Sequence, residues 1–139
     1  MRACYRGGMT RQIIDWKFIH PAGGWDVEPD AVAWIDVSRL DEAWRATDQY
    51  IEPGGINGQD NRYARVGAWF RENRYCNMGF VSLDENKVRF TDGRHRFSWL
   101  RDRGVTALPL QVPSGQANDF ERRFGATTRR SILRREITG

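Results

Sequence analysis

VRFTDGRHRFSWLRDRGVTALPLQV, residues 88–112, decides the fold because its hydrophobic period changes within a few residues. Residues 88–91 alternate apolar and polar side chains, as a strand with one buried face does. Phe97 and Leu100 then follow helical spacing, and Gly104 is suited to end that helix. A second apolar run from Val105 to Val112 predicts another strand. The stretch therefore predicts a strand, a turn, a helix and a strand in succession.

The turn between the first strand and the helix consists of Asp92, Gly93, Arg94, His95 and Arg96. Gly93 permits a tight turn, and the helix N-terminus behind it presents unpaired N–H groups and the positive end of a dipole. Arg94 and Arg96 add guanidinium groups, whose donors match phosphate oxygens. These residues predict an anion site, with phosphate as the natural candidate. The alternative is an ordinary solvated turn in which a backbone carbonyl satisfies His95.

The segment DGRHR at 92–96, between a strand and an apolar helix, resembles the phosphate-binding signature of the ParB/sulfiredoxin superfamily. In that superfamily a Gly-x-(His or Arg)-Arg turn binds nucleotide or nucleic-acid phosphates. The sequence of the turn and the small size of the chain are most similar to those of the Osa-like plasmid fertility inhibition factors. The strong part of the resemblance covers about residues 88–112, and a looser agreement extends over 32–112. It implies an α+β fold of the ParB/sulfiredoxin type, a small mixed β-sheet packed by three to five helices.

The resemblance also implies a function, the suppression of plasmid conjugation or T-DNA transfer between bacteria, with nucleotide hydrolysis and DNA cleavage attached to the fold. It implies ATP or another nucleoside triphosphate as a ligand, and DNA or a component of the conjugative or type IV secretion machinery as a partner. Sulfiredoxins carry a reactive cysteine where this chain has Arg94, so thiol repair is not expected. ParB proteins carry Glu-Arg-Arg after the glycine, so their cytidine-triphosphate switch is not expected either.

Three hypotheses use the same turn differently. In an ATPase or DNA nuclease, Arg94 and Arg96 would hold phosphate oxygens, and His95 would be a general acid or a further phosphate donor. Asp92 would hold Mg²⁺ directly or through water. Because one carboxylate makes a poor metal site, a second ligand is expected from Glu52, Asp60 or Glu85. The alternatives are a non-catalytic module that binds nucleotide or DNA backbone, and an interaction protein that blocks a partner's surface.

A glycine-rich loop at 51–60 precedes a predicted helix whose apolar face contains Tyr63, Val66 and Phe70. The loop is either functional or a simple connection. Arg62, at the start of the helix, is the candidate for a second phosphate contact. The alternative for Arg62 is a solvated helix face.

The remaining elements before residue 88 follow from local patterns. Residues 10–19 and 31–37 alternate apolar and polar side chains and predict strands. A helix is expected to follow the second strand as far as about Gln49. Residues 80–91 predict a hairpin that leads into the central turn.

Residues 114–139 hold most of the basic excess, with six arginines against three acidic residues, a net +3 compared with +1 over 1–113. We expect this segment to be helical, with a last helix that contains Ile132, Leu133 and Ile137. Its arginines would form a basic stripe for DNA: Arg122, Arg123, Arg129, Arg130, Arg134 and Arg135. The alternative is a solvated face.

Length and composition predict one globular domain over 1–139, with its core at about 10–113. No apolar run reaches the length of a membrane span, and the N-terminus lacks a signal-peptide pattern. A cytoplasmic bacterial protein without membrane insertion is therefore expected, of unspecified oligomeric state. Cys4 and Cys76 are expected to be free thiols, and with the two histidines they match no zinc spacing.

Overall fold

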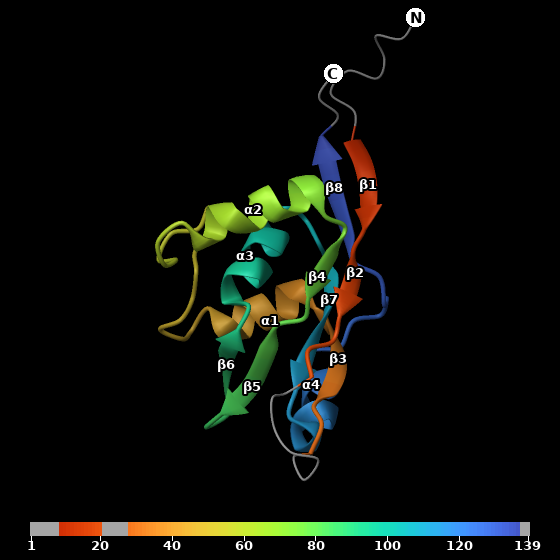
Figure 1. The fold of residues 1–139 in the computed structure, drawn as a ribbon. Helices are drawn as coiled ribbons and strands as arrows, with labels where there is room; N and C mark the ends of the chain where they lie inside the picture. Colours follow the sequence, from red (N-terminus) through yellow and green to blue (C-terminus); the bar gives the residue numbers. More distant parts are fainter. Residues whose placement is uncertain (1–8, 21–27, 137–139) are drawn as a thin grey trace, which may run out of the picture.

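The fold is known from a computed structural model that describes residues 9–20 and 28–136 (Figure 1). Its centre is a mixed four-stranded sheet in the order β3-β7-β5-β6. The strands are β3 (Ala31–Asp36), β5 (Phe80–Asp84), β6 (Lys87–Asp92) and β7 (Ala107–Val112). β7 pairs antiparallel with β3 and parallel with β5, and β5 forms the predicted hairpin with β6. The order brings the strand before the DGRHR turn and the strand after its helix into one sheet.

Four α-helices are present in the described part of the chain, so the predicted α+β class with a small mixed sheet is confirmed. None of these helices is long and apolar enough to cross a membrane. They are α1 (Val37–Trp44), α2 (Arg62–Glu72), α3 (Arg94–Asp102) and α4 (Ala117–Phe124), with a short 3₁₀ turn, η2 (Ser114–Gln116), before α4. The helix expected to reach Gln49 ends at Trp44, so that Gln49 lies beyond it. Its side chain exchanges two hydrogen bonds with the backbone of Phe90, which covers the edge of β6.

Two short ladders flank the sheet, β1 (Met9–Ile13) with β8 (Ile132–Glu136) and β2 (Asp15–Lys17) with β4 (Tyr75–Asn77). Figure 1 shows β1 and β8 side by side, although they come from opposite ends of the chain. The prediction of a last helix is therefore wrong. Burial alternates with period two where Leu133 is buried and Arg134 is exposed, as a strand paired with β1 requires.

Aromatic side chains fix α3 against its neighbours. Trp44 meets the rings of Phe90 and Phe97 edge to face, with centroids 4.9 and 5.7 Å away. Phe70 of α2 stacks on Trp99 of α3 at 5.5 Å. Because such pairs bury large areas in a defined geometry, they hold the first turn of α3 at the end of β6 and beside α2.

A buried ionic network ties the glycine-rich loop to α3. Arg101 donates to Asp41 at 2.9 Å and to Asp102 at 2.8 Å. Asp102 also accepts from the hydroxyl of Tyr63 at 2.6 Å and from the amide of Gly54 at 3.0 Å. Burial raises the pKa of Asp102, but these donors outweigh it and leave the pKa below its ordinary value. The loop is thereby anchored by an ionised carboxylate.

Candidate functional site

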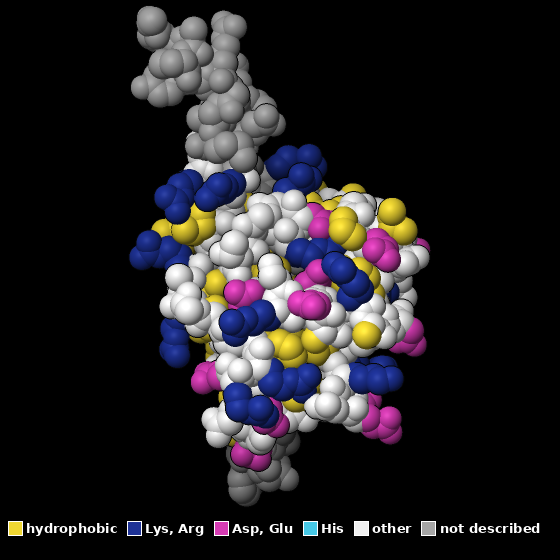
Figure 2. Space-filling view, turned by 180° about the vertical axis from the view of Figure 1, so that it is seen from behind, with side chains coloured by type: hydrophobic (Ala, Val, Ile, Leu, Met, Phe, Trp, Pro, Cys, Tyr) yellow, Lys and Arg dark blue, Asp and Glu magenta, His cyan; other side chains and the backbone are white. Residues whose placement is uncertain are grey.

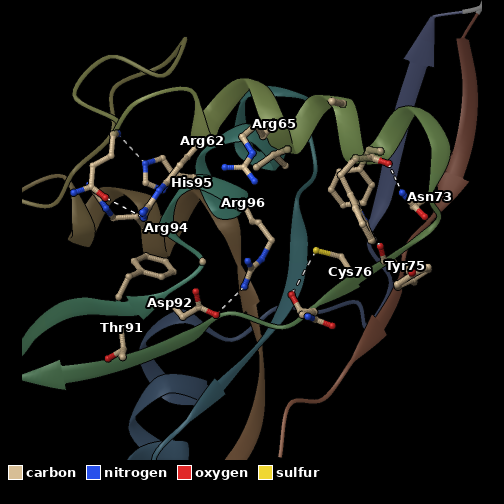
Figure 3. Close-up of a pocket in the computed structure, with 18 of the residues that line it drawn as sticks. Arg62, Arg65, Asn73, Tyr75, Cys76, Thr91, Asp92, Arg94, His95 and Arg96 are labelled. Carbon is tan, nitrogen blue, oxygen red and sulfur yellow. Dashed lines mark hydrogen bonds and ion pairs between the residues drawn. The ribbon is translucent and has the colours of Figure 1, made fainter.

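A groove of about 1180 Å³ runs between α2, β4 and the junction of β6 with α3 (Figure 3). Four arginines line it and are called here the arginine end: Arg62, Arg65, Arg94 and Arg96. Trp69 and Tyr75 line it farther along and are called the aromatic end. The structure thus brings the predicted turn and the predicted second contact, Arg62, into one cavity.

Gly93 shapes the turn at the arginine end. It is the N-cap of α3 with φ +90°, and no side chain caps the helix there. A Cβ at this position would lie 2.8 Å from the Cα of Gly79 and 3.0 Å from Nη2 of Arg96. Glycine is required both for the backbone conformation and for the close approach of the two chain segments. The first turn of α3 therefore borders the groove with no side-chain hydrogen bond capping its amide groups.

His95 lines the arginine end of the groove and is 8% exposed. Its Nε2 accepts a hydrogen bond of 3.0 Å from the backbone amide of Gln59. Burial lowers the pKa of His95, and Arg94, Arg62 and Arg96 lower it further, so the ring is neutral at pH 7. In this arrangement Nε2 carries no proton to donate to a leaving group or to a phosphate. The alternative interpretation of the turn gave His95 a backbone carbonyl as its partner, whereas the partner of Nε2 is a backbone amide.

The two arginines of α2 reach the groove from one helix face. Arg62 is exposed, and its Nη1 donates to the side-chain oxygen of Gln59 at 3.1 Å. Arg65 lies one turn further and points toward the same space (Figure 3). Neither forms an ion pair with any residue in 9–20 or 28–136. Both charges are therefore available to an anion.

The two arginines of the turn differ in their partners. Arg94 donates from Nη1 to the carbonyl of Gln49 at 2.8 Å and has no acidic partner in the described part of the chain. Arg96 donates from Nη2 to Asp92 at 3.1 Å, while its buried Nε has no acceptor there. Asp92 thus satisfies one of the donors of Arg96 and offsets one of four guanidinium charges.

Asp92 is the candidate magnesium ligand, and its surroundings do not fit a resident Mg²⁺. Its carboxylate faces Arg96, a cation. The expected second ligands Glu52, Asp60 and Glu85 do not line the groove. Among the residues that the structure describes, no three His, Cys, Asp or Glu side chains gather as a metal site would need. Asp92 is therefore better described as the ionic partner of Arg96 than as a metal ligand.

Sequence patterns did not single out the aromatic end. Trp69 and Tyr75 meet at right angles, with ring centroids 5.3 Å apart and planes at 87°. The spacing of Arg62, Arg65 and Trp69, at i, i+3 and i+7, was a usable signal because it places them on one helix face. Nothing local marks Tyr75, which reaches the groove because β4 pairs with β2.

Cys76 also lines the groove and is a free thiol, as predicted. Burial raises its pKa to about 11. The thiol is therefore neutral at physiological pH and supplies no thiolate nucleophile. Cys4 lies outside the described residues.

The arginines of the C-terminal segment do not form a helical stripe. Arg122 and Arg123, on α4, are held by Asp119 and Asn86 at 2.8 Å each. Arg129 and Arg130 follow in a loop, and Arg134 lies on β8. The side chain of Arg135 lies outside the described residues. On the face seen from behind, Lys and Arg side chains are spread widely with Asp and Glu among them (Figure 2).

Comparisons with known proteins agree with this architecture. A family model described as plasmid fertility inhibition factor matches residues 32–125, more than half of the chain. The fold is similar to the crystal structure of oncogenic suppression activity protein, a plasmid fertility inhibition factor, in its gold(I) cyanide derivative. That similarity has a TM-score of 0.58 at 17% identity and covers 88% of this chain and 71% of the other. No curated protein sequence matches the chain.

Proposed function

This chain belongs to the plasmid fertility inhibition factor family, and from that premise we propose that it suppresses plasmid transfer by binding a phosphate-bearing ligand in its groove. The observation that carries the proposal is the convergence of four arginines from α2 and the α3 turn on one cavity. The match over 32–125 supports the role in fertility inhibition, and the groove residues lie within that range.

Phosphate fits the arginine end for electrostatic and geometric reasons. Arginine donors match phosphate oxygens, and the uncapped first turn of α3 adds a favourable dipole. The arginines face two carboxylates in the groove, Asp92 and Glu72, so the lining carries a net positive charge. ATP, another nucleoside triphosphate and the backbone of DNA all present such oxygens.

The geometry supports binding better than hydrolysis. A general acid must hold a proton, and Nε2 of His95 is an acceptor in this structure. Asp92 is occupied by Arg96, so the groove offers no free carboxylate beside the turn to serve as a base. Hydrolysis of ATP or DNA would need both groups to change partners.

The test compares tripolyphosphate and ATP binding, measured by titration calorimetry, with suppression of conjugation in cells. We expect the Arg62→Ala/Arg65→Ala double variant to weaken both affinities by about tenfold or more, since two charge-assisted contacts are lost. Suppression of conjugation should fall with them. Arg39→Ala, an exposed arginine of α1 outside the groove, is the matched control.

Two results would change the conclusion. If the double variant binds tripolyphosphate as wild type does, the groove is not a phosphate site. If binding is lost and suppression of conjugation persists, the chain acts instead by occupying the surface of a protein partner. ATP or DNA turnover by the wild-type protein, lost in His95→Ala with binding retained, would establish the hydrolase.

A further inference from the structure

The groove continues beyond the arginine end along one face of α2. Arg62, Arg65 and Trp69 follow one another at i, i+3 and i+7, and all three line the groove. Seven residues of helix at about 1.5 Å each separate the first from the last by roughly 10 Å. The cations and the indole therefore lie in one row, with the cations nearer the start of the helix.

The aromatic end is an exposed corner formed by two side-chain rings, which are its two walls. Trp69 and Tyr75 are 41% and 43% exposed, and their rings are nearly perpendicular. The indole is fixed because its Nε1 donates to the carbonyl of Tyr75 at 2.7 Å. A planar ring that enters this corner can stack on one wall and meet the edge of the other, which are the two favoured aromatic geometries.

The two ends of the groove differ in charge, so they favour different chemical groups of a ligand. Glu72 lines the groove two turns beyond Arg65, on the aromatic side, where its carboxylate disfavours phosphate. Asn73 and Asn77 line the same part of the groove with amide side chains. A neutral ring with hydrogen-bonding edges fits there, and an anion fits at the other end.

We propose that the aromatic end is a base-stacking subsite, so that the groove takes a short single-stranded nucleic-acid segment with its backbone on the arginines and a base on Trp69 and Tyr75. The inference rests on the proposed phosphate function of the arginine end. The roughly 10 Å rise along α2 from Arg62 to Trp69 places both ends of the groove within reach of one short nucleic-acid segment. A positively charged groove combined with exposed aromatic rings is how sequence-tolerant single-strand sites are built.

The experiment measures fluorescence anisotropy of labelled hexathymidylate, with tripolyphosphate and thymidine triphosphate as unlabelled competitors. Trp69→Ala and Tyr75→Ala should each weaken hexathymidylate binding by about tenfold or more, because one stacked base is lost. Trp69→Phe keeps a ring and should lose about threefold or less. Both alanine variants should bind tripolyphosphate within about twofold of wild type, since they leave the arginine end intact.

The controls separate the two proposals from each other and from misfolding. Ile56→Ala, an exposed apolar residue outside the groove, should bind as wild type does, and thermal midpoints check the fold of each variant. Unchanged hexathymidylate binding by Trp69→Ala would overturn the stacking subsite and leave the phosphate site standing. Unchanged tripolyphosphate binding by Arg62→Ala/Arg65→Ala would overturn the phosphate site itself. Thymidine triphosphate that binds as tightly as hexathymidylate would overturn the single-strand proposal and leave a mononucleotide site.

Discussion

The imidazole of His95 accepts a hydrogen bond from the backbone amide of Gln59, at 3.0 Å, and so joins the first turn of α3 to the end of the glycine-rich loop. The bond requires a neutral ring, because a protonated imidazole has no acceptor. The loop and the arginine end therefore share one titratable contact. The loop leads directly into α2, the helix that carries Arg62 and Arg65.

We predict that the stability of the protein falls as pH decreases from 7 to 5. The pKa of His95 is lowered in the folded state, so the unfolded chain binds a proton more readily, and folding loses free energy below the ordinary histidine pKa of about 6.5. Thermal midpoints measured across this range should fall for wild type. His95→Gln keeps an acceptor for Gln59 and should flatten the profile, and a wild-type slope in that variant would assign the pH dependence to other groups.

Gly93→Ala should destabilise the protein more than Gly104→Ala does. Both glycines have positive φ, +90° and +82°, and a side chain there costs about 1–3 kcal/mol of backbone strain. A Cβ at Gly93 would also press on the backbone of Gly79, whereas nothing lies within 4 Å of one at Gly104. Urea unfolding should show an additional loss of about 1 kcal/mol or more for Gly93→Ala. Equal losses would assign the whole cost to strain.

Local patterns in the sequence predicted the turn, the hairpin of β5 and β6, and the faces of α2 and α3 correctly, because those features depend on neighbours in the chain. Non-local pairing accounts for the failures. β8 was predicted as a helix because Ile132 and Leu133 fit either period, and β1, its partner, lies at the other end of the sequence. The partners of His95 and Asp92 likewise depend on side-chain packing that no spacing reveals.

Arg101 should be the residue of the ionic network whose loss costs most. Its side chain is 10% exposed and pairs with Asp41 and Asp102, which are 11% and 14% exposed. Arg101→Met removes the cation that two buried carboxylates share and leaves Asp41 only the longer contact of 3.8 Å with the exposed Arg45, so a loss of about 3–5 kcal/mol in unfolding free energy is expected. The same substitution in an Asp41→Asn/Asp102→Asn background should cost less, because no buried charge is then left unpaired. An equal cost in both backgrounds would mean that packing of the Arg101 side chain, and not charge, is responsible.

The salt dependence of DNA binding should distinguish the groove from the C-terminal arginines. Truncation after Gly125 is unsuitable because it removes β8 and the fully buried Leu133, and with them the partner of β1. Arg129→Ala/Arg130→Ala changes two exposed loop residues instead. For single-stranded DNA each phosphate contact contributes about 0.7 to the slope of log K against log salt, so Arg62→Ala/Arg65→Ala should reduce the slope by about 1.4 and the loop variant should leave it unchanged. The opposite ranking would move the nucleic-acid interface from the groove to the C-terminal segment.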